Sequence, residues 1–115
     1  MTEFEQQSAI YREFCQLPQG QHLSRLLEFL ASDNQAKNVV ASTFLTKLGP
    51  QVVHTLIIEA MAKRRGPKQV VRFLDVVEAI GAPLSPNDFF AVGTLMRSPH
   101  AIVREKIAQL MIKLR

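Results

Sequence analysis

The sequence predicts an all-α protein of about seven helices. At four places a plausible N-cap residue, Ser or Gly, precedes proline. Proline is tolerated at the first helical position because its missing N–H has no intrahelical acceptor there. Between these places, apolar residues recur every three or four positions, the spacing of one helix face. A chain of 115 residues with 47% hydrophobic and 21% charged side chains is long and apolar enough for one domain with its own core.

Helix boundaries follow in chain order from local signals. Thr2 and Glu5 have the spacing of a capping box at the start of the first helix. Gly49 and Gly81 follow apolar helical residues, where a left-handed residue would end a helix. The expected helices span residues 3–16, 21–32, 34–48, 50–64, 67–80, 86–97 and 99–114. The connections between them are short, so neighbouring helices should pack antiparallel as hairpins.

A weak internal repeat underlies these helices. When Leu48, Ile80 and Leu114 are aligned, at spacings of 32 and 34 residues, three further columns are apolar throughout. These columns are Ala41, Phe73 and Ile107; Phe44, Val76 and Leu110; and Leu45, Val77 and Met111. A repeat of this length with two helices per unit is typical of a solenoid, in which each hairpin buries its apolar face against the next.

The repeated segments resemble a known family. The stretches SDNQAKNVVASTFLTKLG and SPHAIVREKIAQLMIKLR look like the second helix of HEAT repeats, and GPKQVVRFLDVVEAIG aligns between them. The resemblance covers roughly residues 20–115. It implies a short right-handed α-solenoid of stacked antiparallel hairpins within a single domain, residues 1–115. The hairpins would be 20–49, 50–81 and 82–115, with residues 1–19 as an extra helix.

The alternative to a solenoid is a compact irregular bundle in which the repeat spacing is a coincidence. The helix over 67–80 favours the solenoid, because apolar residues leave only a narrow polar stripe on it and neighbours must cover more than one side. In the solenoid register, Phe44, Phe73, Val77 and Leu110 should be buried.

Residues that could carry catalysis or hold a metal are scattered. The histidines, His22, His54 and His100, do not have the four-residue spacing that places two ligands on one helix face. Some HEAT-like proteins are metal enzymes that use His-Glu pairs, but this chain contains no His-Glu dipeptide. Cys15 lies in an apolar stripe, where a buried inert thiol is expected. We therefore expect no catalytic residues, no metal site, no cofactor and no enzymatic activity.

Cysteine usage and hydropathy predict the compartment. A single cysteine excludes an internal disulfide framework and suits a reducing compartment. The acidic residues Glu3 and Glu5 argue against a signal peptide, and no apolar run approaches the roughly 18 residues of a membrane span. The expectation is a soluble cytoplasmic protein that does not bind membranes.

Basic residues are the feature that could carry binding. The formal net charge is +4, and residues 34–115 carry most of the positive charge. Two sets are candidates for partner binding: the cluster Lys63, Arg64, Arg65, Lys68 and Arg72, and the ridge Lys47, Arg72, Lys106 and Lys113, which should share one exposed face of the solenoid. The structural alternative is that the cluster complements the negative end of a helix dipole and is otherwise solvated.

These features predict a non-enzymatic interaction or scaffold module that binds an acidic segment of another protein on a basic helical face. The alternative is nucleic-acid binding through phosphates, although the chain has one tyrosine and no tryptophan to stack on bases. The last helix also carries Ala108 and Ile112 on a second apolar side. That side is either covered, by a second copy of the chain or by further repeats, or it is a tolerated exposed patch.

Overall fold

The computed structural model of the chain describes residues 2–16 and 19–114, and these residues form helices and connections without any strand. Contacts divide the chain into two compact units, Met1–Lys47 (unit 1) and Leu48–Arg115 (unit 2). The boundary lies within two residues of the junction expected between the first and second hairpins.

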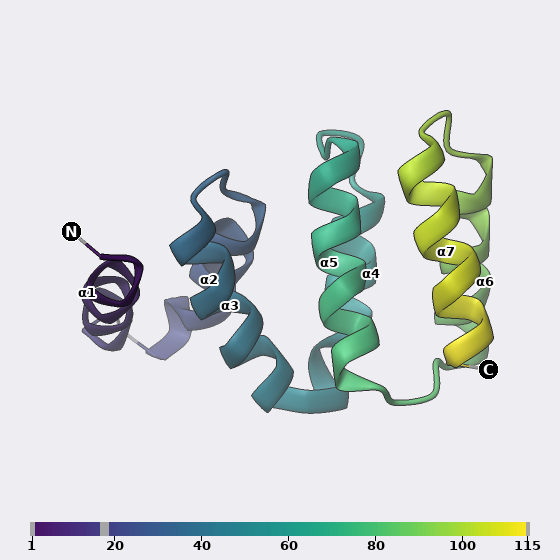
Figure 1. Ribbon diagram of the computed structural model, residues 1–115. Helices are drawn as coiled ribbons and strands as arrows, with labels where there is room; N and C mark the ends of the chain where they lie inside the picture. The colour runs from purple at the N-terminus through teal and green to yellow at the C-terminus, as the bar shows by residue number, and fades with distance from the viewer. Residues whose placement is uncertain (1, 17–18, 115) are drawn as a thin grey trace. The chain divides into compact units, whose positions relative to one another are not determined.

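Unit 1 contains α1 (Glu3–Cys15), a short 3₁₀ turn, α2 (His22–Ala31) and α3 (Gln35–Leu48) (Figure 1). The first helix begins as predicted: the Thr2 hydroxyl oxygen accepts a hydrogen bond from the Glu5 N–H at 3.1 Å. The Asn34 side chain accepts a hydrogen bond from the Lys37 N–H and caps α3 in the same way. Both caps satisfy backbone donors that have no partner inside the helix.

The core of unit 1 lies mainly between α2 and α3. The buried apolar residues of these helices are Leu26, Leu27, Phe29, Leu30, Ala36, Val40, Ala41 and Leu45. The Asn38 amide nitrogen donates to the carbonyl oxygens of Phe29 (2.8 Å), Leu30 (3.2 Å) and Ser32 (2.8 Å), where the last turn of α2 has no intrahelical donors. This amide therefore ties the end of α2 to the start of α3.

The first helix joins unit 1 through aromatic side chains. Phe14 is buried, and its ring centroid lies 4.8 Å from that of Phe44 and 4.5 Å from that of His22. Tyr11 stacks on Phe44 with a centroid distance of 5.3 Å. Phe44 is only half-buried, so the prediction that it belongs to the buried core is wrong: its ring lies at the surface, where α1 meets α3. Cys15 is exposed, which also corrects the expectation of a buried thiol.

Unit 2 contains a 3₁₀ turn (Gly49–Val52), α4 (Val53–Met61), α5 (Pro67–Ile80), α6 (Pro86–Thr94), a second 3₁₀ turn (Leu95–Arg97) and α7 (Ala101–Lys113). The helix α5 packs on both α4 and α7, and α6 packs on α7 and α4 (Figure 1). Phe73, Val77 and Leu110 are fully buried, as predicted. The apolar α5 is covered on two sides because two neighbours pack against it.

Helix ends in unit 2 follow the predicted signals with four local differences, one of which is that α4 ends at Met61 and not at residue 64. Gly49 and Gly81 adopt the left-handed conformation, with φ of 77° and 73°. The segment 50–52 is 3₁₀ rather than α-helical, and residues 95–97 continue α6 as a 3₁₀ turn. The last helix begins at Ala101 and not at Pro99, because the Ser98 hydroxyl accepts from the His100 N–H two residues on and holds the backbone in a turn.

Candidate functional site

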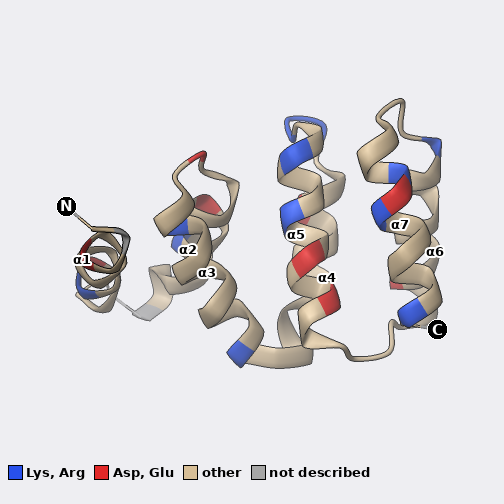
Figure 2. Cartoon of the chain, viewed as in Figure 1, with Lys and Arg blue, Asp and Glu red and all other residues tan. Residues whose placement is uncertain are grey.

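An open hollow of about 600 Å³ lies in unit 2, at the end where α4 leads into α5 and α6 leads into α7. Its apolar wall includes Met61, Val70, Leu95 and Val103, which come from four different segments. Its polar wall includes the basic side chains Lys63, Arg65, Arg97 and His100, and no aspartate or glutamate lines it. We call it the basic hollow. Figure 2 shows basic residues at both of these turns, at the top of unit 2.

The basic residues of the hollow differ in how they are paired. Lys63, Arg97 and His100 are exposed. Within residues 2–16 and 19–114, none of the three forms an ion pair. Because Lys63 and Arg97 carry like charges here without a counter-charge among the described residues, the hollow is suited to an anionic group.

Arg65 is held in place from two sides. Its guanidinium donates to the Glu59 carboxylate at 2.6 Å, and its Cζ atom lies 5.0 Å from the centre of the buried Phe73 ring, a cation–π distance. The side chain is only 11% exposed, and its buried Nε–H has no acceptor in the described part of the chain. A buried donor without a partner costs about 1–3 kcal/mol.

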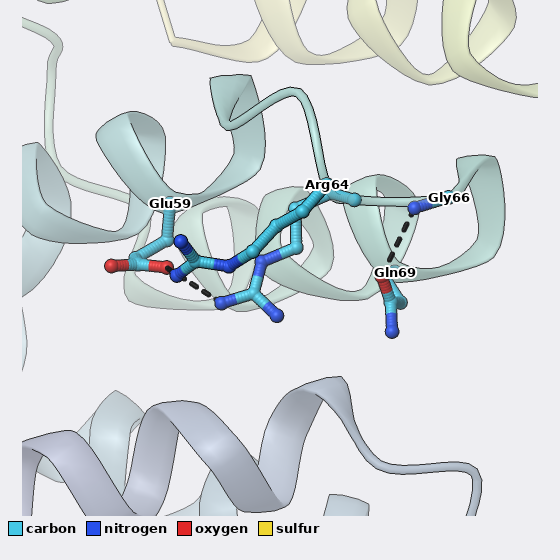
Figure 3. Close-up of polar contacts among 5 residues, drawn as sticks. Glu59, Arg64, Gly66 and Gln69 are labelled. Atoms are coloured by element: carbon cyan, nitrogen blue, oxygen red, sulfur yellow. Dashed lines mark hydrogen bonds and ion pairs between the residues drawn. The ribbon is translucent and has the colours of Figure 1, made fainter.

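The neighbouring Arg64 shares the same acid but lies outside the hollow. Its guanidinium donates to Glu59 at 3.1 Å and is largely exposed, as Figure 3 shows for the pair. The same view shows the Gly66 N–H donating to the Gln69 side chain at 3.0 Å, which caps the start of α5. Glu59 therefore neutralises part of the predicted basic cluster, whereas Lys63 keeps its charge unpaired.

The start of α7 adds to the positive character of the hollow. His100 occupies the N-cap position, in extended conformation, and its side chain makes no capping hydrogen bond. The Val103 N–H donates to the His100 carbonyl oxygen at 3.2 Å, so only the N–H groups of Ala101 and Ile102 keep their hydrogen-bonding capacity, and the positive end of the helix dipole lies beside His100. Arg104 reaches back from α7 to donate to the Ser98 carbonyl oxygen at 2.6 Å and fixes the preceding turn.

The predicted basic ridge is largely neutralised where it crosses from α5 to α7. Lys106 is 12% exposed and pairs with Asp75 at 2.5 Å and with Glu78, while Lys113 also pairs with Glu78. The expectation that Lys106 is an exposed charge is wrong, because these acids on α5 cover it. Figure 2 shows acidic and basic residues on both helices.

The pKa values in this cluster follow from its contacts. The hydrogen bond from Lys106 and then that from Lys113 lower the pKa of Glu78 from its ordinary value of 4.5. Burial alone would lower the pKa of Lys106, but the hydrogen bonds to Asp75 and Glu78 outweigh it and the pKa is raised. Glu78 and Lys106 are therefore ionised at neutral pH, and their ion pair links α5 to α7.

The remaining predicted residues lie elsewhere. Lys68 is exposed on the first turn of α5, and Arg72 is half-buried one turn further on. Lys47 is exposed in the last turn of α3 and belongs to unit 1. Of the eight predicted residues, Lys63 and Arg65 line the basic hollow, and Arg64 borders it through their shared turn.

Sequence reasoning missed Arg97 and His100. They flank Ser98-Pro99, in the turn between α6 and α7. This position was the available signal, because the α6–α7 turn and the α4–α5 turn line the same hollow. Two turns at one end of packed hairpins bring their side chains together. The prediction instead followed helix ridges, where opposite charges pair.

Other kinds of site are not evident in the described part of the chain. Residues 2–16 and 19–114 contain no group of three or more His, Cys, Asp or Glu side chains placed to hold a metal ion. No helix among these residues has both the length and the apolar character needed to span a membrane. Comparison of the chain with models of protein families, with curated proteins and with solved structures finds no match.

Proposed function

We propose that this chain is a non-enzymatic protein-interaction module that binds an acidic segment of a partner protein in the basic hollow of unit 2. The observation that carries the proposal is the composition of the hollow wall: four basic side chains from two turns, with no acid among them. Carboxylates are the protein groups that such a wall attracts. The apolar side of the hollow adds a place for a bulky aliphatic side chain next to the carboxylate.

The architecture that we propose for this function is a short α-solenoid of about seven helices that resembles HEAT repeats. The packing of α5 on both α4 and α7 supports stacking of hairpins within unit 2. Stacking explains why turns from successive hairpins line one hollow. The single cysteine of the chain suits a reducing compartment, so we place the interaction in the cytoplasm.

An acidic peptide fits the hollow better than a nucleic-acid backbone does. The aliphatic wall formed by Met61, Val70, Leu95 and Val103 offers no aromatic surface on which a base could stack. A peptide can place a carboxylate among the basic side chains and an aliphatic residue against this wall.

The test is selection from a random peptide library displayed on phage. The parent chain should enrich peptides that carry Asp or Glu beside an aliphatic residue. The double variant Lys63→Glu, Arg97→Glu should bind the selected peptides at least about tenfold more weakly, which corresponds to about 1.4 kcal/mol. Both side chains are exposed, so the variant should melt close to the parent temperature.

A matched control is the double variant Arg25→Glu, Lys37→Glu, which changes the net charge by the same amount at partly exposed positions on α2 and α3, outside the hollow. It should bind the selected peptides as the parent does. Equal losses in both variants would show that only net charge matters. Selection of peptides without acidic residues, or unchanged binding by the hollow variant, would contradict the proposal. Tight binding of duplex DNA with a steep salt dependence would instead support the nucleic-acid alternative.

A further inference from the structure

A second surface, in unit 1, is apolar and open. A groove of about 530 Å³ runs between α1 and α3. Phe4, Tyr11, Val39 and Phe44 line it, and Phe4 is 77% exposed. Tyr11 and Val39 are also exposed large apolar side chains. We call this surface the α1–α3 groove. Exposed aromatic and aliphatic residues that line a groove between two helices suit the apolar face of a third helix.

The charges of this groove define what could occupy it. Arg12 and Lys47 line it, and neither forms an ion pair within the described residues. No aspartate or glutamate lines the groove. A complementary helix would therefore carry large aliphatic residues for the groove floor and a carboxylate for the basic side chains.

The outer face of α7 has this composition. Ile102 and Ile112 are 47% and 66% exposed, and between them lie the exposed residues Glu105 and Ala108. Helical geometry places these four on one side, opposite Val103, Ile107 and Leu110, which are buried in unit 2. Ten residues separate the two isoleucines, so they stand about 15 Å apart along the helix. The small Ala108 allows a close approach of another backbone.

We propose that the outer face of α7 from one copy of the chain occupies the α1–α3 groove of a second copy. Ile102 and Ile112 contact the aromatic floor, and Glu105 pairs with Arg12 or Lys47. The proposal is independent of the basic hollow, because it uses none of the residues that line it. The proposal gives a partner to the second apolar side of the last helix, Ala108 and Ile112. The sequence predicted that this side is either covered or a tolerated exposed patch.

The two surfaces are different, so the contact is head-to-tail and not two-fold symmetric. In the dimer, one copy keeps a free groove and the other keeps a free α7 face, so assembly continues beyond the dimer unless a ring closes. One helix face in a groove buries less than the roughly 1,200–2,000 Å² of a standard stable interface, so association is weak and depends on concentration.

The test combines two variants that each remove one half of the contact. Phe4→Glu places a carboxylate in the groove at a residue that packs little, and acidic residues are favoured in a first helical turn. Ile112→Lys places an ammonium group on the outer face of α7. By light scattering, the parent mass should rise with concentration, whereas each variant alone should remain a monomer because every copy then lacks the same half of the contact. A double variant with both changes should be monomeric.

An equimolar mixture of the two single variants gives the sharpest result. The Phe4→Glu chain keeps its α7 face, the Ile112→Lys chain keeps its groove, and together they should form a dimer with one copy of each. Isotope labelling of one variant, followed by native mass spectrometry, identifies that dimer. A symmetric α7–α7 contact would be lost in Ile112→Lys and kept in Phe4→Glu, which would overturn the proposal.

The matched control is Ile58→Lys, the same change at an isoleucine that is also exposed but lies on α4. It should leave association at the parent level. A loss equal to that of Ile112→Lys would indicate nonspecific apolar association and contradict the proposal. A parent chain that stays monomeric at millimolar concentration, or a variant mixture without the mixed dimer, would also overturn it.

Discussion

The ionised carboxylate of Glu78 links α5 to α7, because it accepts hydrogen bonds from both Lys106 and Lys113. Its pKa is lowered below the ordinary value of 4.5, first by the hydrogen bond from Lys106. A carboxyl group with a lowered pKa stabilises the fold above its unfolded pKa, and this contribution is lost as the pH falls through the folded pKa. The link between α5 and α7 should therefore weaken in acid.

We expect Glu78→Gln to lower the free energy of unfolding by about 1–3 kcal/mol at neutral pH, because hydrogen bonds to charged groups contribute about this much. In acid, below the lowered pKa of Glu78, the parent carboxyl group is protonated, so the difference between parent and variant should shrink. Urea denaturation at both pH values measures it. The exposed Glu105→Gln is the control and should differ from the parent by less than about 0.5 kcal/mol. A Glu78→Gln difference that is equal at both pH values would refute the ionic role.

Phe73 is the largest fully buried side chain of unit 2. We expect Phe73→Ala to cost about 3–5 kcal/mol, because it loses burial and leaves a cavity. It also removes the ring beneath Arg65, whose Cζ lies 5.0 Å from it. Chemical denaturation measures the cost, and a loss below about 1 kcal/mol would mean that α5 is not central to unit 2.

At the scale of the helix, substitution of alanine for two of the glycines should change the stability of the fold in opposite directions. Gly81 ends α5 with φ of 73°, so Gly81→Ala should cost about 1–2 kcal/mol through left-handed strain. Gly93 lies within α6, and a Cβ there would make an ordinary contact, 3.6 Å from Met111 Cε. Gly93→Ala should therefore stabilise by up to about 1 kcal/mol. Thermal melts of both variants check the pair, and a destabilised Gly93→Ala would show that α6 and α7 are packed too closely for a methyl group.

Helix positions followed from the sequence because their signals are local. Proline after Gly66 and after Ser85 marks the starts of α5 and α6, and left-handed glycines lie where they were predicted. The start of α7 was displaced because Ser98 forms a turn with the His100 N–H, and periodicity does not detect such a turn. Phe44 fits the repeat column, yet the half-buried position of its ring depends on where α1 lies, which the repeat does not encode.

The candidate site was harder to predict because it depends on contacts between the helices of unit 2, which lie apart in the sequence. A count of basic residues assigns equal weight to Lys63 and Lys106. The structure separates them, since Asp75 and Glu78 cover Lys106 while Lys63 has no acidic partner within the described residues. The sequence contains both acids, but their role becomes visible only when α5 is known to lie against α7.

The position of α5 between α4 and α7 has a consequence for how the chain folds during synthesis. The contacts of unit 2 join elements close in sequence, which reduces the entropy lost in closing loops and favours rapid folding. However, a nascent chain that has emerged only as far as α5 exposes the face that α7 will cover. This face is buried only after α7 has also emerged from the ribosome. Until then, the exposed face makes the nascent chain prone to aggregate or to need a chaperone.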